Sequence, residues 1–220
     1  MTTAYVFDAY GTLFDVHSAV ARHRARLGPE ADRLSELWRS KQLEYTWTRS
    51  LCGAYRDFAA LTAEALDFAA ARCGGVDRDL RADLLAAYQK LDAYSDVGPT
   101  LQALRARGAK LAILSNGTPA MLEAAVASAR LDGLFDAVLS VDELRVFKTA
   151  PGAYALVEAH MGAKPADVSF QSSNRWDIAG AVRFGFRAVW VNRTGMPDEY
   201  PDLPPARVLP SLAGLVDKRA

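Results

Sequence analysis

The chain has only two cysteines and three histidines among 220 residues, and neither sign of charge is in excess. Cys52 and Cys73 lack the spacing of metal ligands, so we expect two reduced thiols packed in helices of a cytoplasmic protein. The histidines show no partner pattern that would indicate catalysis. The 26 acidic and 26 basic residues cancel, which gives no electrostatic reason to expect nucleic acid or an anionic membrane as a partner.

Long apolar runs are also missing. No stretch approaches the roughly 18 uninterrupted apolar residues of a membrane-spanning helix. The first residues lack the charged and apolar regions of a signal peptide, so we expect neither a membrane span nor a secretion signal. Half of the residues are apolar and 24% are charged, which is the balance of an ordinary globular protein.

Short apolar runs typical of buried strands occur at the start of the chain and again in its second half. They cover residues 4–7, 110–114, 137–139, 168–170 and 188–191. Helical patterns separate the later runs, at about 121–129, 154–161 and 178–184. Strands that alternate with helices predict a parallel sheet covered on both faces. A proline-rich surface stretch, 197–210, is expected to lead into a short final strand and helix.

A long helical segment, about 16–91, separates the first predicted strand from the others. Its apolar residues recur at near-helical spacing, and glycines at Gly53 and Gly74 break the pattern. We therefore expect an α/β protein with a Rossmann-like core and an inserted all-helical cap. The predicted core domain comprises residues 1–14 and 95–220, and the predicted cap domain comprises residues 15–94.

Polar side chains follow the predicted strands. Asp8 ends the first strand, Ser115 and Asn116 end the second, and Lys148 lies in a loop before a helix. The segment Ser172-Ser173-Asn174 follows a further strand. Because ligands of an open parallel sheet bind at the carboxyl ends of its strands, we expect these residues to meet at one edge, beneath the cap.

Four segments in this order resemble the motifs of the haloacid dehalogenase superfamily, and more narrowly those of the (S)-2-haloacid dehalogenases. They are Asp8-Ala-Tyr-Gly-Thr12, Leu114-Ser-Asn-Gly-Thr118, Lys148 and Ser172-Ser-Asn-Arg-Trp-Asp177. The cap segment Leu37-Trp-Arg-Ser-Lys-Gln-Leu-Glu-Tyr-Thr-Trp47 is also typical of that family. The resemblance spans nearly the whole chain. It implies a homodimer without metal or cofactor that converts short (S)-2-haloacids into (R)-2-hydroxyacids and halide.

The resemblance implies roles in the reaction for several residues. Asp8 is expected to displace the halide and form an ester, with Lys148 favouring its ionised form. Thr12 and Ser172 would orient Asp8 and its neighbours through hydroxyl hydrogen bonds. Asp177 and Asn174 are the candidates to hold the hydrolytic water, and the group that accepts the water proton stays open. Tyr154 would support Lys148.

Other residues are expected to bind the substrate. Arg39 from the cap and Asn116 are the candidate donors to the departing halide. Ser115 and backbone N–H groups near Tyr10 and Gly11 would bind the substrate carboxylate. An apolar wall around the alkyl chain is expected from Tyr10, Leu43, Phe58 and Trp176. Ser40 stands where relatives often have a larger glutamine, which would leave a roomier or differently polar approach to the site.

Two alternatives remain at this stage: a magnesium-dependent small-molecule phosphatase, and a binding protein on an inactivated scaffold. Phosphatases of the superfamily have a second acid two residues after the nucleophile, where this chain has Tyr10. They also hold magnesium with acids of the last motif, which here begins Ser172-Ser173 and keeps only Asp177. Halide leaves without a proton, so the missing general acid favours dehalogenation. Asp8 and Lys148 are both present, which disfavours an inactivated scaffold.

Overall fold

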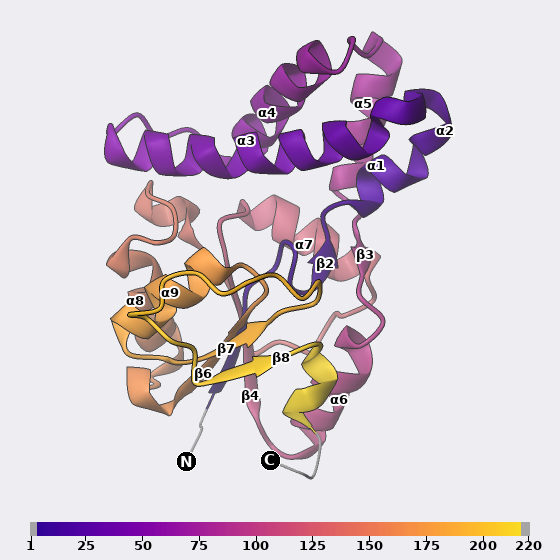
Figure 1. The fold of residues 1–220 in the computed structure, drawn as a ribbon. Coiled ribbons are helices and arrows are strands. Elements are labelled where there is room, and N and C mark those ends of the chain that lie inside the picture. Colours follow the sequence, from indigo (N-terminus) through magenta and orange to yellow (C-terminus); the bar gives the residue numbers. More distant parts are fainter. Residues whose placement is uncertain (1–3, 217–220) are drawn as a thin grey trace.

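The structure, a computed structural model, describes residues 4–216, and a six-stranded parallel sheet lies at its centre (Figure 1). In spatial order the strands are β5 (Ala137–Ser140), β4 (Lys110–Ser115), β1 (Ala4–Phe7), β6 (Val168–Ser172), β7 (Arg187–Val191) and β8 (Arg207–Leu209). The chain runs from β1 to β4 and β5 on one side, and then returns to β6, β7 and β8 on the other. The connections therefore change direction at β1, which is where open parallel sheets bind ligands.

Helices cover the sheet, which is why most residues of its strands are apolar. They are α6 (Val97–Ala106), α7 (Pro119–Ser128), α8 (Pro151–Met161) and α9 (Arg175–Phe184), with short 3₁₀ turns at Val141–Leu144, Pro165–Asp167 and Leu212–Leu215. Prolines begin α7 and α8, and the Thr118 side chain caps α7. Strand β4 is buried from Leu111 to Ser115, as expected for a strand with both faces covered.

A helical layer lies above the carboxyl edge of the sheet, and the start of β1 and the final 3₁₀ turn lie on the opposite side of the molecule (Figure 1). We call this layer the cap. It comprises α1 (Ser18–Arg22), α2 (Arg24–Leu27), a 3₁₀ turn (Gly28–Glu30), α3 (Ala31–Leu51), α4 (Phe58–Arg72) and α5 (Arg78–Tyr88). It joins the core through the short antiparallel strands β2 (Phe14–Asp15) and β3 (Asp92–Ala93), which pair with each other.

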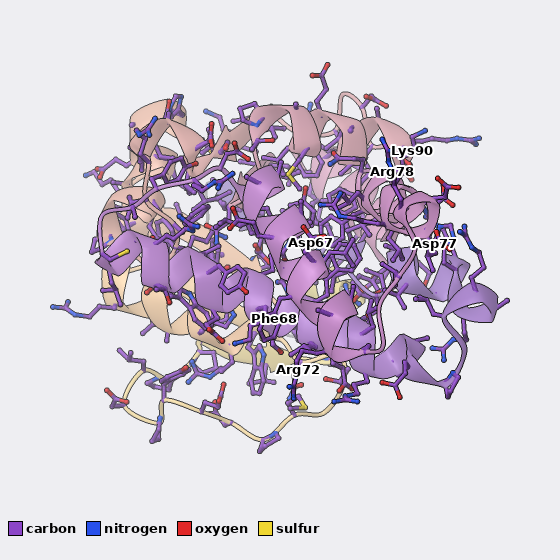
Figure 2. The ribbon with its side chains drawn as sticks, turned by 90° about the horizontal axis from the view of Figure 1, so that it is seen from above. Asp67, Phe68, Arg72, Asp77, Arg78 and Lys90 are labelled. Carbon is purple, nitrogen blue, oxygen red and sulfur yellow. The ribbon has the colours of Figure 1, made fainter. Side chains whose placement is uncertain are left out.

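Helix α3 packs against α4 through a stripe of side chains four residues apart. The stripe comprises Leu34, Trp38, Gln42 and Thr46, all of them buried. The Trp38 indole donates a hydrogen bond of 2.8 Å to the Thr62 carbonyl of α4. Charged side chains lie on the outer surface instead, and Figure 2 labels Asp67, Arg72, Asp77, Arg78 and Lys90 there. This one-sided pattern is what holds the cap helices together.

The predicted α/β fold with its helical insertion is confirmed, but several local predictions were incomplete. The final strand, β8, lies within the proline-rich stretch and before Pro210, and a 3₁₀ turn rather than an α-helix follows it. Helix α6 and the β2–β3 pair had no predicted counterpart, since Gly98-Pro99 disguises the first turn of α6 and two-residue strands leave no periodic pattern.

Both cysteines are free and follow helix ends, Cys52 after α3 and Cys73 after α4. The expectation that both are packed in helices was wrong, because neither lies within a helix and only Cys73 is buried, while Cys52 is exposed. Within residues 4–216, no helix has the length and apolar character to cross a membrane. The predicted domain limits begin at residue 1 and end at residue 220, so their outermost residues, 1–3 and 217–220, lie outside the described part of the chain.

Truncating the inner face of α4 should destabilise the fold far more than truncating an exposed position on α3. Leu61 is fully buried, so Leu61→Ala should lower the free energy of unfolding by about 2–5 kcal/mol. Leu51 is 90% exposed, and Leu51→Ala should change it by less than about 0.5 kcal/mol. Urea unfolding of both variants measures the difference. Equal losses would contradict the packing described for the cap.

Candidate active site

The carboxylate of Asp8 is the centre of the site. Asp8 directly follows β1 and is buried, and its backbone N–H still donates to the Gln171 carbonyl of β6 at 2.9 Å. Its Oδ2 accepts two hydrogen bonds of 2.8 Å, one from the Thr12 hydroxyl and one from the Asn174 amide. Its Oδ1 accepts only from the Lys148 ammonium, at 3.2 Å. The two oxygens therefore differ in how many donors hold them.

The Lys148 ammonium lies between two carboxylates. Besides Asp8 it contacts Asp177 Oδ2 at 3.0 Å, and it stands 5.1 Å from the centroid of the Phe170 ring. The other oxygen of Asp177, Oδ1, accepts a hydrogen bond of 2.8 Å from the Tyr154 hydroxyl. Gly180 makes room for that tyrosine, because a Cβ atom there would collide with its hydroxyl. All four polar side chains of this cluster are buried.

Burial and charge act on these groups in opposite directions. Burial raises the pKa of Asp177 to about 6, with Lys148 opposing this shift and the negative charge of Asp8 adding to it. Burial by itself would lower the pKa of Lys148, but the carboxylates of Asp177 and Asp8 outweigh it and raise that pKa. Burial, followed by the charge of Asp177, likewise raises the pKa of Tyr154, which keeps its hydroxyl a donor.

The loop after β6 orients Asp8 through several contacts. The Ser172 hydroxyl accepts from the Asn174 N–H at 3.1 Å, and the Thr12 hydroxyl accepts from the Ser173 N–H at 2.8 Å. Asn174 occupies the N-cap position of α9 without capping the helix with its side chain, because its amide donates to Asp8 instead. The Asn174 side chain thus orients Asp8, and the end of α9 lacks the stabilisation that a side-chain cap would give.

Arg39 reaches the site from helix α3 of the cap. Its Nη2 donates to the Tyr10 carbonyl at 3.0 Å and to the Asn174 side-chain oxygen at 3.2 Å. Its Nη1 donates to Gln42 Oε1 at 2.8 Å, within the cap. One guanidinium therefore links the cap to the core directly above Asp8.

The turn after β4 closes another side. The Ser115 hydroxyl accepts from the Gly117 N–H at 3.1 Å, and Asn116 Oδ1 accepts from the Lys148 N–H at 3.0 Å. The Tyr10 ring lies against Gly117, where a Cβ atom would come within 2.7 Å of it. This turn therefore needs glycine so that the aromatic wall can approach.

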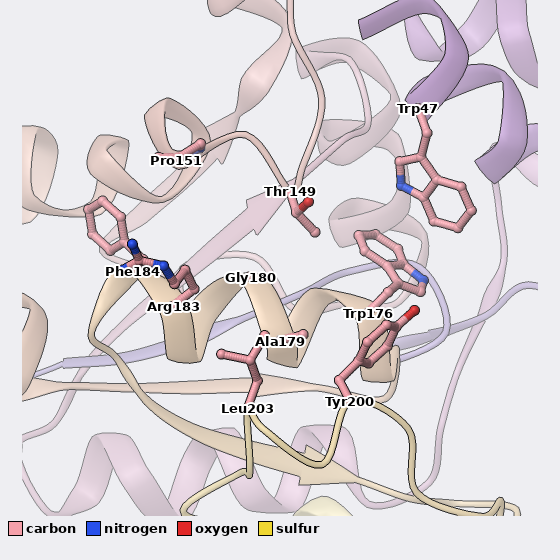
Figure 3. Close-up of a pocket in the computed structure, with 10 residues that line it drawn as sticks. All are labelled: Trp47, Thr149, Pro151, Trp176, Ala179, Gly180, Arg183, Phe184, Tyr200 and Leu203. Atoms are coloured by element: carbon pink, nitrogen blue, oxygen red, sulfur yellow. The ribbon is translucent and has the colours of Figure 1, made fainter. Parts of the chain in front are cut away.

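These groups enclose a cavity of about 10 Å³, room for about one water molecule. Its lining consists of Asp8, Tyr10, Arg39, Leu43, Phe58, Ser115, Asn116 and Trp176. Trp176 also lines a larger outer pocket of about 720 Å³, beside Trp47 and Tyr200 (Figure 3). The two tryptophan rings meet edge to face at 5.5 Å, so they close the seam between α3 and α9.

All the residues that line this cavity are predicted site residues. The other predicted residues do not line it; apart from Gly11 they belong to the hydrogen-bond network around Asp8: Thr12, Lys148, Tyr154, Ser172, Asn174 and Asp177. Two details differ from the expectation. The Gly11 N–H was expected to be available to a substrate carboxylate. It donates instead to the Phe14 carbonyl at 2.8 Å in a tight turn. Tyr154 donates to Asp177 and thus supports Lys148 only indirectly. Sequence analysis also missed Gln42, although a polar residue within the apolar stripe of α3 was a usable signal.

No group of three or more His, Cys, Asp or Glu side chains suited to a metal ion occurs within residues 4–216. Two carboxylates, Asp8 and Asp177, flank the single ammonium of Lys148. The arrangement suits a nucleophilic carboxylate kept apart from bulk water, with donors placed to receive developing negative charge.

Comparison with known proteins agrees with this geometry. Residues 2–185 match the family described as haloacid dehalogenase-like hydrolase. The chain is 48% identical over 213 residues to (S)-2-haloacid dehalogenase 1 of Pseudomonas sp. (strain CBS-3), covering 96% of this chain and 94% of that protein. It is 47% identical to (S)-2-haloacid dehalogenase 4A of Burkholderia cepacia, with coverage of 96% and 92%.

Solved structures are similar over the whole molecule. The L-2-haloacid dehalogenase from Xanthobacter autotrophicus with chloropropionic acid covalently bound superposes with a TM-score of 0.88 at 40% identity. That match covers 98% of this chain and 97% of the other. With the matching motifs now placed around one buried carboxylate, the chain belongs to the haloacid dehalogenase-like hydrolase family.

Proposed function

We propose that this protein is a hydrolytic (S)-2-haloacid dehalogenase that replaces the halogen of a short 2-haloacid by a hydroxyl group. The observation that carries this proposal is the buried Asp8 carboxylate beside the Lys148 ammonium, in a cavity where Tyr10 stands in place of a second acid. The names of the relatives support it, as does the covalently bound chloropropionic acid in one of their structures.

The first step is displacement at carbon. Oδ1 of Asp8 has a single, longer hydrogen bond, so its lone pairs are the freer ones to attack C2 of the substrate. The carbon–halogen bond breaks as the new carbon–oxygen bond forms, and the halide leaves with the electron pair. Attack from the side opposite the halogen inverts C2 and produces an ester of Asp8.

The remaining groups would bind the substrate. The Ser115 hydroxyl oxygen accepts from Gly117, which leaves its proton for the substrate carboxylate. Asn116 Oδ1 is engaged by the Lys148 N–H, so its amide nitrogen and the Arg39 guanidinium are the donors for the departing halide. The alkyl group would lie against the apolar wall of Tyr10, Leu43, Phe58 and Trp176.

The second step is hydrolysis of the ester. Water attacks the carboxyl carbon of Asp8 while Asp177 accepts its proton, and negative charge develops on Oδ2. Thr12 and Asn174 already donate to that oxygen, so they form the oxyanion site. When the bond between this carbon and Oδ1 breaks, the proton passes to the leaving oxygen and an (R)-2-hydroxyacid is released.

The charge of Asp8 also influences the pKa of Asp177, and therefore whether Asp177 is ionised and able to act as a base. In the free site the negative charge of Asp8 contributes to the raised pKa of Asp177, which is about 6. Esterification removes that charge, so the pKa of Asp177 falls in the ester. Asp177 is therefore ionised at neutral pH during the step that needs a base.

Substrate access requires movement, because the closed cavity holds no more than about one water molecule. We propose that the cap domain, residues 15–94, opens relative to residues 1–14 and 95–220, with the β2–β3 pair as its hinge. Phe14 pairs with Ala93 where the chain passes from the core into the cap and back, and this pairing supports the division.

We further propose a homodimer in the cytoplasm. Trp47, Leu51 and Phe68 are exposed on the cap helices and could be covered by a second copy. The exposed free thiol of Cys52 fits a reducing compartment.

Purified protein should release chloride from 2-chloropropanoate in the presence of a chelator. Asp8→Asn should lower the turnover rate by about 10⁵-fold or more, since it removes the nucleophile. An ion-selective electrode measures the release, and p-nitrophenyl phosphate with magnesium serves as the comparison assay. Phosphatase activity that needs magnesium, with no halide release from any short 2-haloacid, would contradict the proposed function.

A single turnover in ¹⁸O-labelled water should place the label in Asp8 and not in the hydroxyacid. The reason is that the product oxygen comes from the carboxylate and water replaces it there. Mass spectrometry of the peptide that contains Asp8 measures this. Label found first in the product would mean that water attacks C2 directly.

Ester hydrolysis should slow in acid, because protonated Asp177 cannot act as a base. The fall should begin below pH 6, since loss of the Asp8 charge in the ester brings the pKa of Asp177 under its free-site value of about 6. The Tyr154 hydrogen bond lowers the pKa of Asp177, so Tyr154→Phe should raise that pKa and move the acidic limb of ester hydrolysis, measured in a single turnover, to higher pH. Tyr94→Phe is the matched control, since Tyr94 packs on Arg193 instead. A limb that stays in place or moves to lower pH in Tyr154→Phe would refute this role of Asp177.

A further inference from the structure

Gln42 is a fully buried amide on α3, and all its hydrogen-bonding partners belong to the cap. Its Oε1 accepts from Arg39 Nη1 at 2.8 Å and from the Tyr88 hydroxyl at 3.1 Å. Its Nε2 donates to the Thr62 hydroxyl of α4 at 2.7 Å. Both polar atoms of the amide are therefore held, and the side chain links α3, α4 and α5. Such a fully partnered buried group has one well-defined orientation.

The position of Gln42 matters because of what it holds. A guanidinium is planar, so fixing one of its nitrogens fixes the direction of the others. With Nη1 on Gln42, the Nη2 group of Arg39 points down to the Tyr10 carbonyl and to Asn174, at the wall of the catalytic cavity. The i, i+3 spacing of Arg39 and Gln42 places both on the same face of α3.

We infer that Gln42 is a positioning residue that aims Arg39 at the halide as it leaves. This inference rests on the proposed function and on the role of Arg39 within it. Gln42 does not line the cavity, so it would act only through Arg39. Its effect should fall mainly on the displacement step, because ester hydrolysis depends on Arg39 only through the 3.2 Å contact of its Nη2 with the Asn174 side-chain oxygen.

The leaving group provides a specific readout. Negative charge develops on the halogen in the transition state, and a donor stabilises it only when it is correctly placed. Chloride is a poorer leaving group than bromide, so breaking the carbon–chlorine bond depends more on that donor. A misdirected Arg39 should therefore slow displacement of chloride more than displacement of bromide. A general loss of packing would slow release of chloride, release of bromide and ester hydrolysis to a similar extent.

The test uses Gln42→Met, which keeps the length of the side chain and removes its hydrogen bonds. Thr62 keeps the Phe58 carbonyl as its acceptor in this variant, at 2.7 Å in the present structure. Thr46→Val is the matched control, because Thr46 is the next residue of the buried stripe and bonds only to the Leu43 carbonyl. Single-turnover halide release from 2-chloropropanoate and 2-bromopropanoate is measured for the wild type and both variants.

In Gln42→Met we expect release of chloride to slow by about 10- to 100-fold and release of bromide to slow clearly less. Ester hydrolysis should slow less than release of chloride, and Thr46→Val should match the wild type in both steps. Equal slowing of both halides, or no slowing, would overturn the inference. Absence of halide release from the wild type would instead refute the proposed function, so the two failures are distinguishable.

Gln42→Met also leaves the Tyr88 hydroxyl without its acceptor in the interior of the cap, which destabilises the protein. If that variant shows no cooperative thermal unfolding, Gln42→Met with Tyr88→Phe replaces it, because this pair leaves no unpartnered phenol. The rates of chloride and bromide release from this double variant are then compared, and a greater slowing for chloride supports the positioning role of Gln42.

Discussion

The site depends on one buried ammonium shared between two buried carboxylates. Isolated charges are expensive to bury, and a pair is tolerated only when hydrogen bonds satisfy the remaining oxygens. Here Lys148 bridges Asp8 and Asp177, while Thr12, Asn174 and Tyr154 supply the other donors. The cluster has a net charge of −1 when both acids are ionised, and Arg39 from the cap brings it to zero. Closure of the cap thus completes the electrostatic balance as well as the walls.

Core and cap contribute different parts of the chemistry. In the proposed mechanism the core supplies the nucleophile, the base and the oxyanion donors, which follow β1 and β6 or lie at the start of α9, where a rigid sheet determines their spacing. The cap supplies Arg39, Leu43 and Phe58 to the lining of the cavity. The proposed covalent chemistry therefore lies in the core, while the residues proposed to bind the substrate come from both core and cap.

Much of this arrangement could be predicted from the sequence, because a parallel sheet brings its carboxyl strand ends together regardless of their separation in the chain. Asp8, Ser115 and Ser172 follow from that rule alone. The contacts of Arg39 do not, since they depend on the angle at which the cap packs on the core. On α3, the apolar pattern marked Trp47 as readily as Trp38, yet Trp47 is 36% exposed and Trp38 is 2% exposed. Periodicity identifies the apolar face of a helix. It does not show over what length of the helix other elements cover that face.

The pairing of Phe14 with Ala93 and of Asp15 with Asp92 has a further consequence. The chain leaves the core and returns to it at adjacent points. The whole cap is therefore inserted into the core like a single loop whose two ends lie side by side. Lengthening a loop whose ends already meet adds little entropic penalty to folding. A different insertion could be accommodated at this junction without rethreading any strand of the sheet. The same nucleophile could in this way come to serve other substrates during evolution.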